Sequence, residues 1–205
     1  MQLFHAPRSC SLGIRILLEE IGVPHQVATI DLSSGQQRDA AFLAVNPKGK
    51  VPALLRDDGT VLTEFQAIAL WLARRFPEAG LLPEDADAAA RVIEAMEFIV
   101  GTVHMRGFAL AIMPSKFVSS PTAQGELRVH GMRVATDGLH HISALLGETT
   151  PWLSGPRPGV ADAALFYVTY WAKALNIDLP STLDAFYDQM LKRPSVVRAI
   201  DASPT

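Results

Sequence analysis

Cysteine is almost absent from this sequence: Cys10 is the single cysteine among 205 residues. One thiol excludes an internal disulfide framework and fits a reducing compartment, so we expect a cytoplasmic protein. The same scarcity makes Cys10 either an incidental residue or a reactive centre.

A strong charge of one sign is also missing. The chain has 18 basic and 21 acidic residues, a net charge of −3, and its basic residues are scattered. We therefore expect no nucleic-acid partner. No apolar run approaches the roughly 18 residues that cross a bilayer, and no basic segment followed by an apolar one opens the chain, so neither a membrane span nor a secretory signal is expected.

The first part of the chain alternates strand-like and helical patterns. Strand-like runs cover residues 2–5, 26–30, 52–55 and 60–62, and apolar residues at helical spacing cover 10–21, 36–45 and 65–76. The order β-α-β-α-β-β-α predicts an α/β domain over residues 1–77. Residues 77–85 have the proline, glycine and acid content of a linker.

The remainder is helical throughout. Helical patterns cover residues 87–103, 160–175, 181–191 and 195–200, and Ser120-Pro121 opens a further helix. Asp162 is placed to cap the helix over 160–175, with Gly159 as a tolerable N-cap. We therefore expect a second, all-α domain over residues 85–205.

The most informative motif is Asn-Pro-Lys-Gly-Lys-Val-Pro-Ala-Leu at residues 46–54. Proline in a strand is confined to the first residue, an edge or a bulge, and it pushes the preceding Val51 into an extended conformation. Val51 would then offer its N–H and C=O to a peptide-like ligand that binds as an added strand. A surface turn before an ordinary edge strand is the alternative.

Two further positions have the chemistry of a binding site. Cys10 lies at the start of a predicted helix, where the helix dipole would lower the pKa of its thiol, unless it is simply a small packed residue. Glu64 and Phe65 open the helix over 65–76, where unpaired N–H groups and a carboxylate could receive an amino-acid end. There the alternative is an ordinary helix cap formed by Thr63 and Glu64.

Taken together, these residues resemble the cytosolic glutathione transferases over nearly the whole chain. Residues 1–76 resemble their thioredoxin-like domain and residues 85–205 their all-helical domain, and the segment 3–12 looks most like the bacterial beta class, which has cysteine at the position of Cys10. The resemblance implies the transfer of the thiol of glutathione, a co-substrate, to a small apolar electrophile, with a homodimer across the helices that start near Asp87 and Ser120.

The resemblance also implies roles for individual residues. The Val51-Pro52 bond would be cis, and the main chain of Val51 would pair with the cysteinyl unit of glutathione. Lys50 would reach toward the glycyl carboxylate, and Glu64 with the helix start at Phe65 would hold the γ-glutamyl end. A motif over residues 97–104 matches the beta class, so His104 would face the thiol site, where Cys10 would hydrogen-bond the sulfur or become glutathionylated.

One departure bears on affinity. The family usually has serine after the glutamate, and this chain has Phe65. A charge-assisted hydrogen bond worth about 1.5–3 kcal/mol is then missing, or roughly a tenfold to hundredfold loss of affinity without compensation.

Several alternatives remain open at this point. Cys10 could instead carry thiol-disulfide exchange, or the weakened site could belong to a noncatalytic binding or regulatory protein. Four apolar side chains could line a pocket for the second substrate or belong to the core: Phe108, Met113, Phe117 and Trp171. The histidines at 130, 140 and 141 do not share a helix face, so we expect no metal.

Overall fold

A computed structural model describes residues 1–148 and 151–201 of the chain. These residues form two compact units. Unit 1 combines residues 1–82 with the segment from 188 onward, and unit 2 covers residues 83–187. The sequence analysis expected the last helix with the helical domain, whereas it packs in unit 1.

Unit 1 contains a four-stranded mixed sheet and the helices around it. Its strands, in the spatial order β2-β1-β3-β4, are β1 (Gln2–His5), β2 (Gln26–Thr29), β3 (Ala53–Leu55) and β4 (Val61–Thr63). Its helices are α1 (Ser11–Ile21), η1 (Gln36–Arg38), α2 (Ala40–Val45), α3 (Phe65–Arg75), η2 (Pro77–Ala79) and α9 (Pro194–Asp201). The sheet and the helices α1 and α3 give the expected thioredoxin-like fold.

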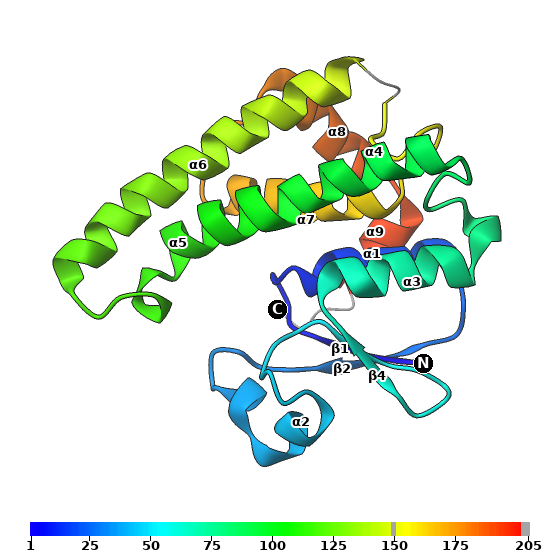
Figure 1. Cartoon of the computed structure of the whole chain (residues 1–205), viewed down its shortest axis with the longest axis horizontal. Coiled ribbons are helices and arrows are strands. Elements are labelled where there is room, and N and C mark those ends of the chain that lie inside the picture. The colour runs from blue at the N-terminus through cyan, green and yellow to red at the C-terminus, as the bar shows by residue number, and fades with distance from the viewer. Residues whose placement is uncertain (149–150, 202–205) are drawn as a thin grey trace. The chain divides into compact units, whose positions relative to one another are not determined.

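The alternation of side chains along β1 explains how helices cover both faces of the sheet. Leu3 and His5 are buried, whereas Phe4, between them, points to the opposite face, where its ring lies 5.7 Å from that of Phe42 in α2. Figure 1 shows α1 and α3 on one side of the sheet and α2 on the other. β1 pairs in parallel with β2 and antiparallel with β3. Both the end of β1 and the start of β3 therefore meet at one end of the sheet, next to Cys10 and Val51.

The helix α9 packs against α1 within unit 1. Glu20 in α1 accepts two hydrogen bonds from the guanidinium of Arg193, at 2.7 and 2.8 Å, and a further one from Ser195. Glu19 accepts a hydrogen bond from Arg198 at 2.6 Å. Side chains more than 170 positions apart thus bind α9 to the first helix of the chain.

The regular elements of unit 2, among its described residues, are helices joined by turns. Its elements are α4 (Ala86–Glu97), η3 (Phe98–Phe108), α5 (Ala109–Ile112), η4 (Pro114–Lys116), α6 (Pro121–Glu148) and α7 (Val160–Ala174), followed by the start of α8 (Ser181–Leu191). In Figure 1, the continuous helix from α4 to α5 and the long α6 run side by side in opposite directions. This agrees with the expected all-helical part of the fold.

Glycines allow these two helices to approach closely. A Cβ on Gly131 of α6 would lie 2.6 Å from the carbonyl oxygen of Gly107, and one on Gly107 would lie 2.9 Å from Ala135. A Cβ on Gly138 would lie 2.6 Å from the side chain of Val103. Larger residues at these positions would force the backbones apart.

The stretch Ala86–Ile112 is long and apolar enough, by length and composition alone, to cross a bilayer, which the sequence analysis did not anticipate. Half of its most apolar window is buried inside the protein, and the core helix of a soluble protein meets the same criterion. The observation is therefore weak evidence for a membrane span.

Asp162 caps α7 as expected. Its carboxylate is fully buried and accepts hydrogen bonds from the main-chain N–H groups of Leu153, Ser154 and Gly159 at 2.8 to 3.0 Å. Because Gly159 has no side chain, it cannot accept the reciprocal hydrogen bond of a capping box, and the Asp162 carboxylate supplies the side-chain cap of this helix.

Candidate active site

Cys10 stands at the N-cap of α1, at the end of a tightly bonded loop. The hydroxyl of Ser11 shares a hydrogen bond of 2.7 Å with Nδ1 of His5 and accepts one from the main-chain N–H of Ala6 at 3.1 Å. His5 and Ser11 are both buried, and burial lowers the pKa of His5 to about 4, helped by the positive charge of Arg15. A neutral His5 and Ser11 therefore fix the loop that presents Cys10.

The thiol of Cys10 is protonated in this structure. The residue is half-buried, and desolvation raises the pKa of its thiol from 9.0 to about 12, with a smaller rise from the negative charge of Glu64. The N–H groups of Cys10 and Ser11 and the cation of Lys50 lower that pKa by less. The expectation that the helix start favours the thiolate is therefore wrong, because loss of hydration outweighs the helix dipole.

Val51 lies directly beside this thiol. The Val51-Pro52 peptide bond is cis, and Sγ of Cys10 donates to the carbonyl oxygen of Val51 at 3.8 Å. No residue within 1–148 or 151–201 hydrogen-bonds the main-chain N–H of Val51. Pro52 precedes β3, which is a central strand rather than the edge strand considered from sequence.

The turn before Val51 is held by the buried side chain of Asn46. Its amide donates to the carbonyl oxygen of Lys50 at 2.7 Å and accepts from the N–H of Lys48 at 3.2 Å. Gly49, at a φ of 60°, donates to the carbonyl oxygen of Asn46 at 2.9 Å. The side chain of Lys50 is exposed to solvent beside this turn.

Glu64 is the N-cap of α3 and has a positive φ of 73°, an uncommon conformation for a residue other than glycine. Its carboxylate is paired with a lysine: Nζ of Lys48 donates to Oε1 at 2.6 Å and also to the hydroxyl of Thr63 at 2.9 Å. Phe65, the first residue of the helix, is 4% exposed, so its ring is packed in the core and offers no donor to a ligand.

The structure thus brings most of the predicted site residues into one unit. Cys10, Val51 and Pro52 meet at the end of the sheet, and both Glu64 and Lys50 contribute to the electrostatic field at the thiol. Sequence reasoning missed Lys48, although it belongs to the motif at 46–54. The signal available was a second cation in that motif, but the periodicity of helices and strands says nothing about turn residues.

His104 belongs to unit 2, in the π-helical segment η3. Its Nδ1 lies 3.2 Å from the hydroxyl of Tyr167, and its ring meets those of Tyr167 and Trp171 edge-on, at centroid distances of 5.5 and 4.8 Å. Phe108 is fully buried and contacts Trp171, whereas Phe117 is 47% exposed. Of the candidates for an apolar pocket, Phe108 therefore belongs to the core, whereas Phe117 lies at the surface.

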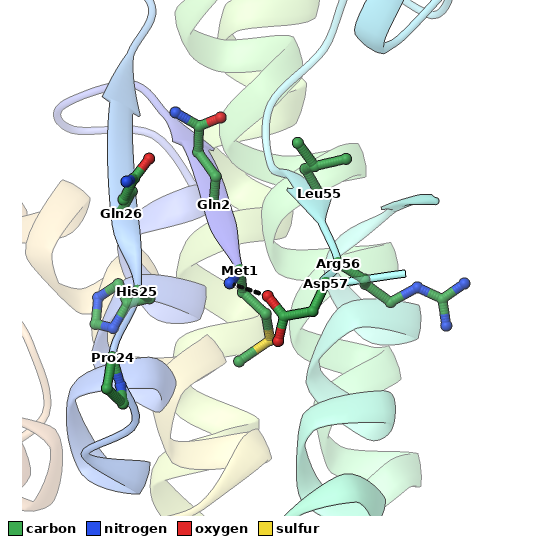
Figure 2. A pocket seen from close by; sticks show the side chains of 8 residues that line it. All are labelled: Met1, Gln2, Pro24, His25, Gln26, Leu55, Arg56 and Asp57. Carbon is green, nitrogen blue, oxygen red and sulfur yellow. Dashed lines mark hydrogen bonds and ion pairs between the residues drawn. The ribbon is translucent and has the colours of Figure 1, made fainter. Parts of the chain in front are cut away.

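A shallow pocket of about 410 Å³ lies elsewhere in unit 1. Figure 2 shows its lining, from the start of β1 (Met1, Gln2), the segment around His25 and the end of β3, with an ion pair between the Met1 ammonium and Asp57 at its wall. It is at the opposite end of the strands from Cys10. Across residues 1–148 and 151–201, no group of three or more histidine, cysteine or acidic side chains is placed to hold a metal ion.

Comparisons with known proteins identify the family of the chain. A sequence profile described as the N-terminal domain of glutathione S-transferase matches residues 8–75. Glutathione S-transferase GstA of Escherichia coli O157:H7 is 35% identical, over 98% of both chains. A glutathione transferase homologue from Sulfitobacter, solved with bound glutathione, has a TM-score of 0.90 and 29% identity, covering 98% of this chain and 96% of its own. The beta-class enzyme of Sphingomonas chungbukensis has a TM-score of 0.84 and 32% identity, over 98% of both chains.

Proposed function

Because the chain belongs to the glutathione S-transferase family and is an enzyme of that family, we propose that it binds glutathione on unit 1 and directs the thiol at a small apolar electrophile. Residues 1–77 carry the glutathione site in this proposal, and the helical part, expected over 85–205, supplies the pocket for the electrophile.

The main chain of Val51 carries the proposal. Its N–H has no partner among the described residues, and its carbonyl oxygen receives only the long contact of 3.8 Å from the Cys10 thiol. A peptide-like ligand could pair with both groups as an extended strand. Glutathione is such a ligand, and it would place its own cysteinyl sulfur near Cys10. Lys50 and Glu64 provide opposite charges for the two ends of the tripeptide.

The protonated thiol of Cys10 supports one chemical role over another. A neutral thiol is a hydrogen-bond donor, and a donor aimed at the glutathione sulfur stabilises its thiolate and lowers its pKa. Exchange with a disulfide would instead require Cys10 itself as a thiolate. With a pKa of about 12, Cys10 is better suited to donate than to attack. We therefore favour conjugation over thiol-disulfide exchange.

His104 would assist from unit 2. Its hydrogen-bonding contact with Tyr167 fixes the ring among aromatic side chains. This surrounding would suit an apolar or aromatic electrophile, since ring edges and faces pack against such molecules.

We also propose a homodimer in the cytoplasm. The outer face of α6 supports an interface there: it carries Val129, which is 74% exposed, in a groove of about 500 Å³ with Met132 and flanking charged residues. An exposed apolar groove with a charged rim is typical of subunit contacts. The single cysteine and the family are consistent with a cytoplasmic location.

The decisive experiment compares two reactions in the wild-type protein and in Cys10→Ala. The wild type should bind glutathione in isothermal titration calorimetry and conjugate it to an aromatic halide. Cys10→Ala should retain binding and lose only part of the conjugation rate, because it removes one donor. If Cys10→Ala abolishes a disulfide-exchange activity that exceeds conjugation in the wild type, exchange is the true reaction. An absence of any binding heat at millimolar glutathione would refute the proposed site itself.

A further inference from the structure

Lys48 holds a defined position although it is a surface lysine. It stands in the turn over 46–49, whose main chain is fixed by the buried Asn46. Its Nζ donates to both Glu64 and Thr63, at 2.6 and 2.9 Å. The turn therefore places one cation directly on the carboxylate that is expected to receive the ligand.

The exposure of this pair leaves it available to a ligand. The side chains of Lys48 and Glu64 are 52% and 59% exposed. An ion pair this exposed adds little to folding stability, because water and salt screen it. Rearranging it around a bound charge is correspondingly easy. Each partner keeps unused capacity as well, since an ammonium has three donors and a carboxylate has about four acceptor sites.

The γ-glutamyl end of glutathione carries an ammonium and a carboxylate on the same carbon. Glu64 can accept from the ammonium, but the adjacent carboxylate needs donors of its own. The Phe65 side chain cannot provide one, because it is an aromatic ring that is 4% exposed. Lys48 is the cation that the structure places beside Glu64.

We propose that Lys48 and Glu64 together bind the zwitterionic end of glutathione, with the Lys48 ammonium on the α-carboxylate and the Glu64 carboxylate on the α-ammonium. This inference rests on the glutathione site proposed above and assigns to it a residue that determines specificity. Lys48 supplies the donor that the side chain at position 65 lacks. The site then selects ligands with a free α-amino-acid group.

The test uses isothermal titration calorimetry with two ligands. One is glutathione, and the other is the same tripeptide with 4-aminobutanoyl in place of γ-glutamyl, which keeps the ammonium and lacks the α-carboxylate. Lys48→Met should weaken glutathione binding about tenfold and leave binding of the analogue within about twofold. Lys50→Met is the matched comparison, since it should weaken both ligands alike. Phe65→Ser in the Lys48→Met background should recover part of the lost affinity for glutathione.

The outcomes separate this inference from the proposed function. If the wild type binds glutathione and Lys48→Met binds it equally well, the assignment of Lys48 is overturned while the glutathione site stands. If Lys48→Met weakens both ligands by the same factor, Lys48 only supports the turn or Glu64, which also overturns the assignment. If the wild type binds neither ligand, the glutathione site itself is refuted. Should Phe65→Ser fail to fold, the two-ligand comparison in Lys48→Met still decides.

Discussion

A chain with one cysteine allows the state of its thiol to be measured without interference. Burial raises the pKa of Cys10 from 9.0 to about 12, so at neutral pH the thiolate fraction is about a thousandfold smaller than for a free thiol. A more basic thiolate is also more nucleophilic, and over this range of pKa the rate constant of the thiolate rises roughly twentyfold, which offsets part of the loss. The native protein should therefore react with iodoacetamide about fiftyfold more slowly than the same protein in urea.

The pKa shift also makes stability depend on alkaline pH. The unfolded thiol ionises near pH 9.0, whereas the folded thiol stays protonated up to about pH 12. The unfolded state thus loses its proton first, and the free energy of unfolding falls as the pH rises between these values, by up to about 4 kcal/mol. Cys10→Ser should lack this part of the slope, which makes the difference between the two proteins the quantity to measure.

The assay combines alkylation followed by mass spectrometry with titration of the thiolate absorbance. We expect no thiolate signal in the native protein at pH values where the urea-unfolded protein is already half ionised. If native Cys10 is alkylated as fast as in urea, or titrates below its ordinary pKa, burial does not dominate its environment. The case for a hydrogen-bonding role of Cys10 over exchange would then be lost.

Three further predictions concern the stability of the two units. The pKa of His5 is lowered to about 4, so the unfolded state takes up the proton first as the pH falls below 6.5, and up to about 3 kcal/mol of stability should disappear by pH 4. In urea denaturation, His5→Gln should flatten this dependence of stability on pH. An unchanged slope in His5→Gln, or an equal flattening by the exposed His140→Gln, would contradict the assignment. Gly131→Ala should destabilise the protein by about 1–3 kcal/mol, because its Cβ would lie 2.6 Å from a main-chain oxygen of the facing helix. Gly125→Ala has open space and should stabilise α6 slightly, so equal effects of the two would refute the close helix approach. Asp162→Ala leaves three main-chain N–H groups without their acceptor and should lower the denaturation midpoint by the equivalent of about 3–5 kcal/mol, with Asp162→Asn in between; a loss under about 1 kcal/mol would show that water replaces the carboxylate.

Local patterns were enough for most elements of the fold. The strand over 2–5 and the helix that begins at Phe65 were predicted from the alternation and spacing of apolar residues, and Asp162 from its place in the first turn of α7. The helix over 36–45 is divided into η1 and α2 because Asp39 is extended and caps the second piece. Such breaks depend on a single backbone conformation that periodicity cannot reveal.

The long helix of unit 2 was predicted to end at Val103, but it continues to Ile112 through η3. In this segment the N–H of Ala109 bonds to the carbonyl oxygen of His104, five residues earlier. This π-helical register turns successive side chains away from the 3.6-residue stripe, so the apolar pattern breaks although the helix does not.

At the site, the sequence singled out Cys10, Val51 and Pro52, which the structure brings together, but not the charge state of the thiol. Cys10 at a helix start predicts a lowered pKa by local reasoning, whereas its burial depends on tertiary packing around the sulfur. The pairing of Lys48 with Glu64 likewise follows from a turn and from the positive φ of Glu64, which bring together positions 16 apart. Both features require the folded chain.

The bonding of α9 to α1 has a consequence for biosynthesis. Unit 1 is interrupted in the chain by the whole of unit 2, so the ribosome makes the partners of Glu19 and Glu20 only after unit 2. Until residues 193–198 leave the exit tunnel, the surface of α1 that packs against α9 stays uncovered in the nascent segment 1–82. A chain truncated before residue 193 would lack these contacts, so a loss near its C-terminal end would destabilise the segment 1–82, which is synthesised first.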